Sequence, residues 1–303
     1  MTGEAHTTRD ELRARRGSRL FGRMRPSGVM IATLSTLVVF GGIIFAVVNA
    51  PGFDRVQAAF FDPALFARSV PLLAESLWRN IQIFVIAEVA ILVFALVLAV
   101  MRSLPGPVFF PFRLMAISYI EFFRAIPGIL VIYLLALGVP GLRIPGLINE
   151  PFFWGIVALV LVWSAYVAEV YRAGIEAIHP SQEAAARSLG LSRVQGLRFV
   201  VLPQAIRRVV PPLLNDFIGL QKDTALVSFV GVVEIFRRSQ IIAGGAFNFT
   251  PYIVCALFFL LLTIPTARLV DYFASRDRTR KLGGVGGVGG GSRRGRLLGS
   301  GPR

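Results

Sequence analysis

Residues 81–101 read IQIFVIAEVAILVFALVLAVM, and Glu88 is the only charged side chain in this stretch. A helix of roughly 20 apolar residues can cross the hydrocarbon core of a bilayer, because it satisfies its backbone hydrogen bonds internally. We therefore predict a membrane-spanning helix here. Five further stretches meet the same criterion, namely 29–50, 114–139, 152–170, 209–233 and 247–267. The sequence thus predicts an all-α integral membrane protein with six transmembrane helices.

The composition of the 303-residue chain agrees with a membrane location. Hydrophobic residues make up 55% and charged residues 16%, whereas charged residues make up about 25% of an ordinary soluble domain. The formal net charge of +15 on so apolar a chain favours contact with anionic lipid over contact with nucleic acid. The high apolar content excludes a disordered chain, and the single cysteine, Cys255, excludes a small disulfide scaffold.

The basic residues predict the orientation of the spans. Twenty-four of the 32 Lys and Arg residues fall on one side of the six predicted helices and six on the other. Because the side rich in Lys and Arg is cytoplasmic in most membrane proteins, we expect both termini inside the cell. The apolar run of the first span is longer than the core of a typical signal peptide, so we interpret it as an uncleaved anchor.

The connections predict the domain organisation. A basic cytoplasmic arm (1–28) precedes the first span (29–50), and an extracytoplasmic linker (51–75) follows it, punctuated by Pro51-Gly52, Asp62-Pro63 and Pro71. We expect residues 51–78 to form a loop with short helical pieces. The main transmembrane domain covers 76–273, and its only long cytoplasmic connection is 171–208, which contains a candidate coupling loop (176–203). The glycine-rich basic tail (274–303) either touches the membrane surface or has no function.

Charged side chains inside the predicted spans are costly and therefore informative, at roughly 2.5–3.5 kcal/mol each on insertion scales. Glu121 and Arg124 are three residues apart, as are Glu169 and Arg172, so each pair shares a helix face and is expected to neutralise itself. Structural pairing is the simpler interpretation of both.

The fifth predicted span carries Asp216, Lys222 and Asp223. The two acids are seven residues apart and share a face, whereas Lys222 points about 100° away from Asp223. Lys222 therefore needs a partner elsewhere, unless the helix is broken there. A polar pathway and a structural polar junction remain equally open, and we take as pathway or gate candidates Glu121, Arg124, Asp216, Lys222, Asp223 and Thr224. Pro127-Gly128 and Pro211-Pro212 are expected to mark bends or helix starts.

The long connection predicts two short helices with a fixed bend. The first covers 182–189 and ends at Gly190, and Ser192 with Gln195 forms a capping box for the second, which ends at Pro203. The first helix presents a small apolar surface of Ala184, Ala185 and Leu189, a shape suited to insertion into a groove on another protein.

This connection resembles the EAA loop of bacterial ATP-binding cassette (ABC) importer permeases, whose pattern is E-A-A-x3-G-x9-I-x-L-P. The matching residues are Glu183, Ala184, Ala185, Gly190, Leu202 and Pro203, with Val200 in the Ile position. Three flanking stretches resemble motifs of the polar amino acid permeases: 121–127 (EFFRAIP), 168–175 (AEVYRAGI) and 220–226 (LQKDTAL). Asn215 and Glu234 also match, and Ala replaces the usual Gly at 125 and 173. The likeness covers about residues 76–273.

The resemblance implies a five-span permease core with one additional N-terminal span, in the bacterial cytoplasmic membrane. It implies a second permease chain, a separate ATPase subunit that binds ATP and Mg²⁺, and an external solute-binding protein that delivers a polar amino acid. The coupling contacts would come from Glu183, Ala184, Ala185, Leu189, Gly190, Val200, Leu202 and Pro203. Independently, the only two lysines, Lys222 and Lys281, lie in no Walker motif, so we expect no cofactor in this chain and no enzymatic activity.

Two other classes of function remain to be compared with the residues. An ion-coupled secondary transporter or channel would use Glu121, Arg124, Lys222 and Asp223 without partner subunits, but no inverted repeat is visible. A membrane enzyme is poorly supplied, because His6, His179 and Cys255 make no metal-binding set and His179 is expected to cap a helix.

Overall fold

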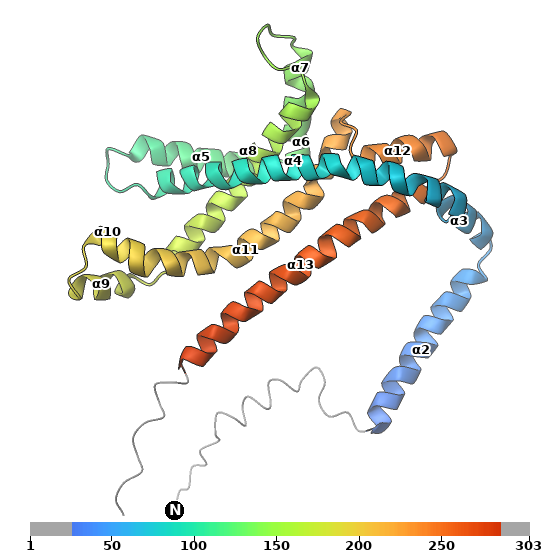
Figure 1. Cartoon of the computed structure of the whole chain (residues 1–303), viewed down its shortest axis with the longest axis horizontal. Coiled ribbons are helices and arrows are strands. Elements are labelled where there is room, and N and C mark those ends of the chain that lie inside the picture. Colours follow the sequence, from blue (N-terminus) through green and yellow to red (C-terminus); the bar gives the residue numbers. More distant parts are fainter. Residues whose placement is uncertain (1–25, 286–303) are drawn as a thin grey trace, which may run out of the picture. The chain divides into compact units, whose positions relative to one another are not determined.

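The computed structural model describes residues 26–285, and side chains are described for 29–270 apart from Glu183, Arg193, Val194 and Leu197. The predicted arm (1–28) and tail (274–303) therefore lie largely outside the described residues. The chain divides into two compact units, residues 1–59 and 60–303. Every regular element from residue 26 to residue 285 is a helix, as the sequence predicts (Figure 1).

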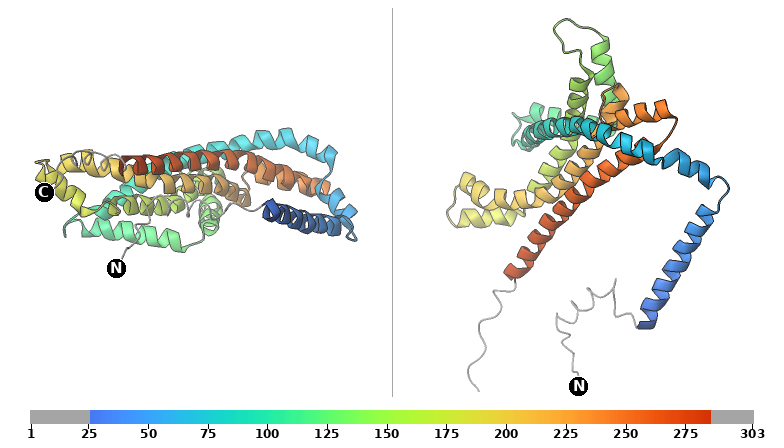
Figure 2. Two further views of the ribbon diagram at one scale, coloured as in Figure 1. Left: turned by 90° about the horizontal axis from the view of Figure 1, so that it is seen from below. Right: turned by 45° about the vertical axis from the view of Figure 1, so that its right-hand side comes forward.

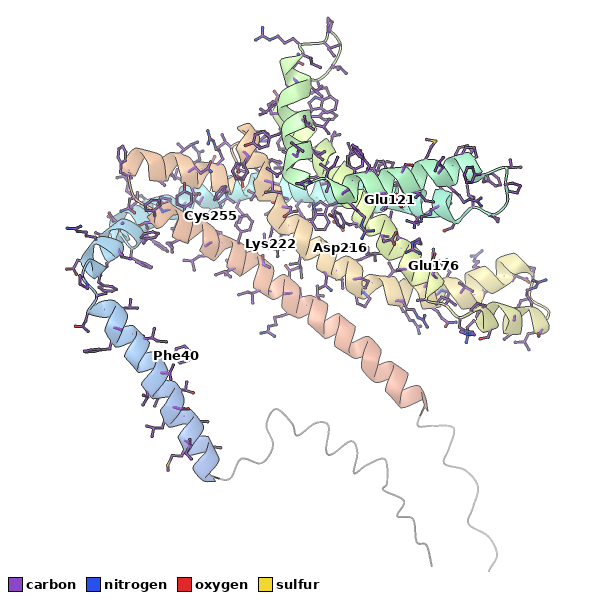
Figure 3. The ribbon with its side chains drawn as sticks, turned by 180° about the vertical axis from the view of Figure 1, so that it is seen from behind. Phe40, Glu121, Glu176, Asp216, Lys222 and Cys255 are labelled. Carbon is purple, nitrogen blue, oxygen red and sulfur yellow. The ribbon has the colours of Figure 1, made fainter. Side chains whose placement is uncertain are left out.

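The first unit contains α2 (Pro26–Val48) and most of α3 (Phe53–Phe60). The described side chains of α2 are all exposed, including Phe40, which is labelled in Figure 3. Thr33 and Thr36 donate hydrogen bonds to carbonyls four residues back, which satisfies their hydroxyls within the helix. The helix is long and apolar enough to cross a membrane, in agreement with the first predicted span.

The prediction of a loop over 51–78 is wrong for most of its length. Only α3 is a short helical piece, and α4 then runs without interruption from Pro63 to Ser103. The side chain of Asp62 caps the start of α4 by accepting from the N–H groups of Ala64 and Leu65. Pro71 does not break the helix, because it lies on an exposed face, while Leu73 and other residues at helical spacing are buried against α12 and α13.

The third predicted span (114–139) is not one straight helix. It consists of α5 (Phe110–Ala125), followed by α6 (Gly128–Tyr133), a π-helical turn η1 (Leu134–Gly138) and α7 (Val139–Gly141). The axis turns by 102° between Ala125 and Gly128. The expected bend at Pro127-Gly128 is confirmed: Pro127 disfavours helical backbone at Ile126, which is extended, and α6 begins at Gly128.

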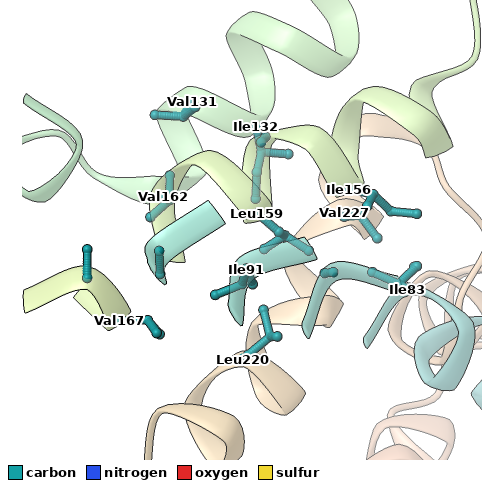
Figure 4. Packing of buried hydrophobic residues seen from close by; sticks show 14 of the residues in the cluster. Ile83, Ile91, Val131, Ile132, Ile156, Leu159, Val162, Val167, Leu220 and Val227 are labelled. Atoms are coloured by element: carbon teal, nitrogen blue, oxygen red, sulfur yellow. The ribbon is translucent and has the colours of Figure 1, made fainter. Parts of the chain in front are cut away.

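The helix α8 (Pro151–Glu176) lies at the centre of the second unit and contacts α4, α5, α6 and α11. Small residues at helical spacing on α8, such as Gly155, Ala158 and Ala165, are buried and allow these close approaches. Figure 4 shows the resulting core, in which Ile91 of α4, Leu159 of α8 and Leu220 of α11 meet. Within a bilayer such contacts are stabilised by van der Waals packing, which the small residues of α8 permit.

The long connection after α8 contains α9 (Pro180–Ser188) and α10 (Arg193–Gly196). The expectation that the second short helix ends at Pro203 is wrong. A π-helical turn η2 (Leu197–Val201) joins α10 to α11 (Leu202–Asp223), and Pro203 occupies the first turn of α11, where its missing N–H costs little. The views in Figure 2 show α9 and α10 side by side at the end of α8 and α11.

The fifth predicted span also begins earlier than expected. Pro211 and Pro212 lie inside α11 and do not open it. Because the two prolines have no N–H group, two carbonyls of the preceding turn have no hydrogen-bond partner within the helix. That turn carries the exposed Arg207 and Arg208, so water can reach it. After Asp223 the chain tightens into a 3-10 helix, η3 (Thr224–Val230), which ends at Gly231 with a left-handed φ of 86°.

Two helices complete the described chain. The short helix α12 (Ile235–Ala246), for which no helix was expected, is capped by Glu234. The helix α13 (Thr250–Val285) contains most of the sixth predicted span, which was expected to begin at Phe247. By length and composition, four helical stretches in residues 26–285 can cross a membrane, or five if the bent α5–α6 pair counts as one span. The helix α11 is not among them, because five charged residues lower its hydropathy.

Candidate functional site

The connection between α8 and α11 forms a rigid bend, which we call the elbow (α9 and α10 with the turn between them). Nδ1 of His179 accepts from the N–H of Ser181, so His179 caps α9 as predicted. At the other end of α9, the N–H of Gly190 bonds to the carbonyl of Arg187 and the N–H of Leu191 to that of Ala186. This pair of bonds is a Schellman motif, which requires the left-handed φ of 82° that Gly190 adopts.

The predicted capping box is present at the start of α10. The N–H of Ser192 donates to Oε1 of Gln195 at 2.9 Å, and the N–H of Gln195 donates to Oγ of Ser192 at 3.3 Å. The two short helices also contact each other directly, because Gly196 packs beside the buried Ala186. Local hydrogen bonds therefore fix the bend of the elbow from both sides.

The elbow exposes a small apolar surface. Ala184 and Ala185 are exposed, and Leu189 is 82% exposed, although a leucine normally gains by burial. Of the other predicted coupling residues, Val200 is half-buried, while Leu202 and Pro203 are exposed where α11 begins. The side chain of Glu183 lies outside the described part of the chain. The described residues of the chain leave this surface uncovered.

A chain of ion pairs lies where the elbow joins the helices. Glu169 of α8 accepts from Arg102 at the end of α4, at 2.9 Å, and also pairs with Arg172, as its spacing predicts. Arg172 pairs in turn with Glu176 in the last turn of α8, labelled in Figure 3. The side chains of Arg102, Glu169 and Arg172 are only about a quarter exposed. The network therefore ties the end of α4 to the residues directly before the elbow.

Glycines bring α8 and α11 into close contact beside this network. A Cβ atom on Gly174 would lie 2.0 Å from Cγ2 of Val209, and a Cβ atom on Gly219 would lie 2.4 Å from the Trp163 ring. Nearer the start of α8, a Cβ atom on Gly155 would lie 3.0 Å from Val227. No larger residue fits at the first two positions without movement. The glycines thus allow close contact of α8 with α11 at two points and with η3 at a third.

A buried polar junction forms where α11 changes into η3. Nδ2 of Asn80 donates to Oγ1 of Thr224 at 3.1 Å and to Oε2 of Glu234 at 2.9 Å, while Oδ1 of Asn80 accepts from the N–H of Ile235. Glu234 is fully buried and also accepts from the N–H groups of Phe236 and Arg237. Burial raises the pKa of the Glu234 carboxyl, although these hydrogen bonds favour its charged form.

Asn80 was not among the residues expected at a functional site. The available signal was an amide directly before the apolar stretch 81–101, and the predicted span begins one residue after it. Among the predicted pathway residues, Thr224 alone belongs to the junction, where it is fully buried and also donates to the carbonyl of Gln221.

The other predicted pathway residues do not converge on one point. Glu121 and Arg124 lie on an exposed face of α5 and form no ion pair with each other in the described structure, so the pairing expected there is not observed. The Arg124 guanidinium lies instead 5.7 Å from the centre of the Tyr166 ring. Arg124 therefore contacts Tyr166 of the neighbouring helix α8 and not Glu121 on its own helix.

On α11, the side chains of Asp216, Lys222 and Asp223 have different surroundings. Asp216 and Asp223 are half-buried, and one carboxylate oxygen of Asp216 is buried without a hydrogen-bond partner in the structure. Asp223 faces the Trp163 side chain. Lys222 is exposed, as expected from its different face, and Figure 3 labels it on α11 together with Asp216. In the part of the chain with described side chains, no group of three His, Cys, Asp or Glu residues could hold a metal ion.

Comparison with known proteins assigns the arrangement to a family. The sequence profile of the family described as "Binding-protein-dependent transport system inner membrane component" matches residues 108–279, more than half of the chain. The chain belongs to this family. It is thus a permease component of an ABC transport system, a class of subunit that is not an enzyme and works with a separate ATPase.

Curated relatives agree with the assignment to the permease family. The chain is 35% identical over 205 residues to the probable glutamine ABC transporter permease protein GlnM of Bacillus subtilis, a match that covers 67% of this chain and 91% of that protein. It is 32% identical to the glutamine transport system permease protein GlnP of Escherichia coli K12, with 67% and 92% covered. The arginine transport system permease protein ArtQ of Bacillus subtilis is 31% identical, with 70% and 93% covered.

Solved structures support the permease fold. A crystal structure of an amino acid ABC transporter with histidines superimposes with a TM-score of 0.65 at 33% identity, over 71% of this chain and 98% of that chain. The MetNI methionine ABC transporter, in an inward-facing conformation, gives a TM-score of 0.51 at 19% identity, over 67% and 96% of the two chains, and shows the fold alone.

Proposed function

We propose that this permease forms part of the transmembrane pathway of an importer for a polar amino acid and that the elbow couples this pathway to the ATPase. The observation that carries the proposal is the elbow itself, a doubly capped bend with an exposed apolar surface at Leu189. The relatives are named as glutamine and arginine permease proteins, and these names support a polar amino acid as the substrate.

The coupling role follows from rigidity. A flexible loop would absorb a displacement, whereas the elbow is fixed by the Schellman motif and the capping box and is continuous with α11 through η2. A push on Ala184, Ala185 or Leu189 is thus transmitted to α11 at one end and to α8 at the other. Within α8 and α11, the glycine contacts pass the movement to the rest of the bundle.

The proposed assembly has three kinds of chain: permease, ATPase and binding protein. Two permease chains, of which this is one, enclose the pathway, and two ATPase subunits that bind ATP and Mg²⁺ contact the elbow. An extracytoplasmic binding protein delivers the amino acid. The membrane topology that fits this assembly has six spans, with α11 as the fifth and both termini in the cytoplasm, because the elbow then lies on the side rich in Arg. The charged residues of α11 then face a polar environment, which makes Asp216, Lys222 and Asp223 candidates for the pathway.

Transport by the reconstituted complex tests the proposal. Proteoliposomes that contain this chain, its ABC ATPase and its binding protein, both sought in the same genome, should accumulate radiolabelled glutamine, arginine, histidine or glutamate only when ATP is supplied. The matched control omits the ATPase. Uptake of any of these amino acids by the permease alone, driven by a proton or sodium gradient, would contradict the proposal.

A further inference from the structure

A pocket of about 590 Å³, which we call the outer pocket, lies at the end of α8 that is remote from the elbow. Its lining includes Arg79 of α4, Glu150 directly before α8, Phe152 in the first turn of α8, and residues 230–233, where η3 ends. The volume falls within the roughly 300–1,000 Å³ of small-molecule sites. Figure 1 shows the connection between α7 and α8 and the elbow at opposite ends of α8, so the topology proposed above places the outer pocket on the extracytoplasmic side.

The outer pocket carries two charges of opposite sign, and neither has a charged partner. Arg79 and Glu150 both have exposed side chains, and the described residues contain no ion pair or side-chain hydrogen bond of either. Glu150 stands at the cap position of α8, but its carboxylate does not cap the helix. The Arg79 guanidinium lies 5.8 Å from the centre of the Phe152 ring, a cation–π contact that supplies no hydrogen-bond acceptor. The donors of Arg79 and the acceptors of Glu150 are therefore available to a ligand.

Two opposite charges in one pocket favour a ligand that carries both. A free amino acid has a carboxylate and an ammonium group on the same carbon atom, whatever its side chain. The planar guanidinium of an arginine matches the two oxygens of a carboxylate, and a glutamate carboxylate accepts hydrogen bonds from an ammonium group. A simple anion or cation would be attracted by one of the two residues and repelled by the other. The other side chains of the lining, such as Phe152 and Val230, are apolar and suit the hydrocarbon part of an amino acid side chain.

We propose that the outer pocket binds a free amino acid by its two charged groups, with Arg79 on the α-carboxylate and Glu150 on the α-ammonium group. The inference deepens the function proposed above and rests on it, because the amino acid comes from the binding protein on this side of the membrane. The pocket borders the polar junction, since Arg79 directly precedes Asn80 and Val233 directly precedes Glu234. A bound amino acid thus lies beside the junction, while selection among side chains takes place elsewhere.

Saturation-transfer difference NMR, which detects ligands that bind weakly and exchange fast, tests the outer pocket. The experiment uses the full-length chain in nanodiscs of phosphatidylglycerol, so that no lipid with a zwitterionic head group competes. L-Glutamine is the probe, because a pocket that recognises only the shared charges binds it whichever amino acid is transported. We expect the wild-type chain to saturate L-glutamine without any ATPase or binding protein. The absence of saturation would overturn the proposal.

Two variants assign the two charges. Arg79→Gln should raise the Kd of L-glutamine about fivefold and leave nearly unchanged that of L-glutaminamide, which lacks the carboxylate. Glu150→Gln should raise the Kd of L-glutamine to a similar extent and leave nearly unchanged that of glutaramate, which lacks the ammonium group. Arg68→Gln and Glu75→Gln, the same changes at exposed residues of α4 outside the lining, are the matched controls and should have no effect. An equal Kd of L-glutamine in all four variants, or equal losses for L-glutamine and its analogues, would refute the assignment.

The outcome is separable from that of the transport test. ATP-driven uptake without saturation would refute the outer pocket alone, whereas saturation without ATP-driven uptake would refute the proposed function alone. A pocket that instead contacts the binding protein would give variants with weaker binding of that protein and no saturation of L-glutamine, and this result would also overturn the proposal. Because the side chains of Arg79 and Glu150 are exposed, both variants should keep the wild-type melting temperature.

Discussion

The contact between Gly174 of α8 and Val209 of α11 gives the sharpest prediction from the packing. A Cβ atom on Gly174 would lie 2.0 Å from Cγ2 and 3.3 Å from Cβ of Val209, both part of a short, stiff side chain. Val209 is 6% exposed, so it has no free space into which it can rotate. Gly174→Ala must therefore separate the two helices just before the elbow.

The expected magnitude combines two effects. Overpacking of a tight contact costs about 1–3 kcal/mol, and the better helix propensity of alanine returns about 0.5–1 kcal/mol. We expect Gly174→Ala to lower the free energy of unfolding by about 1–2 kcal/mol. Gly138→Ala is the matched control, because Gly138 has helical backbone angles and no atom within 4 Å of its added Cβ, and we expect it to be neutral or slightly stabilising.

Unfolding of the purified protein by a denaturing detergent, followed by circular dichroism, provides the measurement. It should be repeated in a Val209→Ala background, where the clashing methyl group is absent. There Gly174→Ala should cost almost nothing, which corresponds to a coupling energy of about 1–2 kcal/mol between the two sites. An equal cost of Gly174→Ala in both backgrounds would refute the argument from the helix contact.

Three further predictions follow from the site. First, Glu169→Gln should destabilise the protein by about 1–2 kcal/mol more than Arg102→Gln does. The reason is that Glu169→Gln removes the shared acceptor of two partly buried arginines, whereas Arg102→Gln leaves the Glu169–Arg172 pair intact. Equal melting temperatures of the two variants would contradict the network. Second, Gly190→Val should raise the ratio of ATP hydrolysed to amino acid transported, because a left-handed φ costs a β-branched residue about 1–2 kcal/mol. Gly190→Asn should have a smaller effect. Identical ratios for wild type and Gly190→Val would show that the bend is not required. Third, Glu234→Gln should lower the thermal stability, because an amide NH₂ must then face N–H donors of Phe236, Arg237 or Asn80. Glu75→Gln, on an exposed face of α4, should leave the thermal stability unchanged. A melting temperature unchanged by Glu234→Gln would argue against the junction.

Much of the local structure of the elbow was predictable from the sequence, because its signals are local. The cap at His179, the left-handed Gly190 and the Ser192–Gln195 box each depend on residues within a few positions of one another, and each is present. The bend at Pro127-Gly128 was predictable for the same reason, because its sequence signal is also local.

The features that the sequence did not predict depend on contacts between distant segments. Pro71 indicated a loop, but burial of Leu73 and its neighbours against α12 and α13 keeps α4 helical. Pro203 indicated a helix end, but a π-helical turn accommodates it. The hydrogen bonds of Asn80 to Thr224 and Glu234 span more than 140 residues, and no local pattern reveals them.

The central claim is that the elbow contacts a separate ATPase, and site-specific photocrosslinking tests it most directly. A photoreactive amino acid at Ala185, which is exposed on α9, should crosslink to the ATP-binding subunit in the assembled transporter, whereas the same group at Leu147, in the exposed connection between α7 and α8, should not. Crosslinks from position 185 to lipid alone, in a complex that still transports amino acid with ATP, would contradict the account.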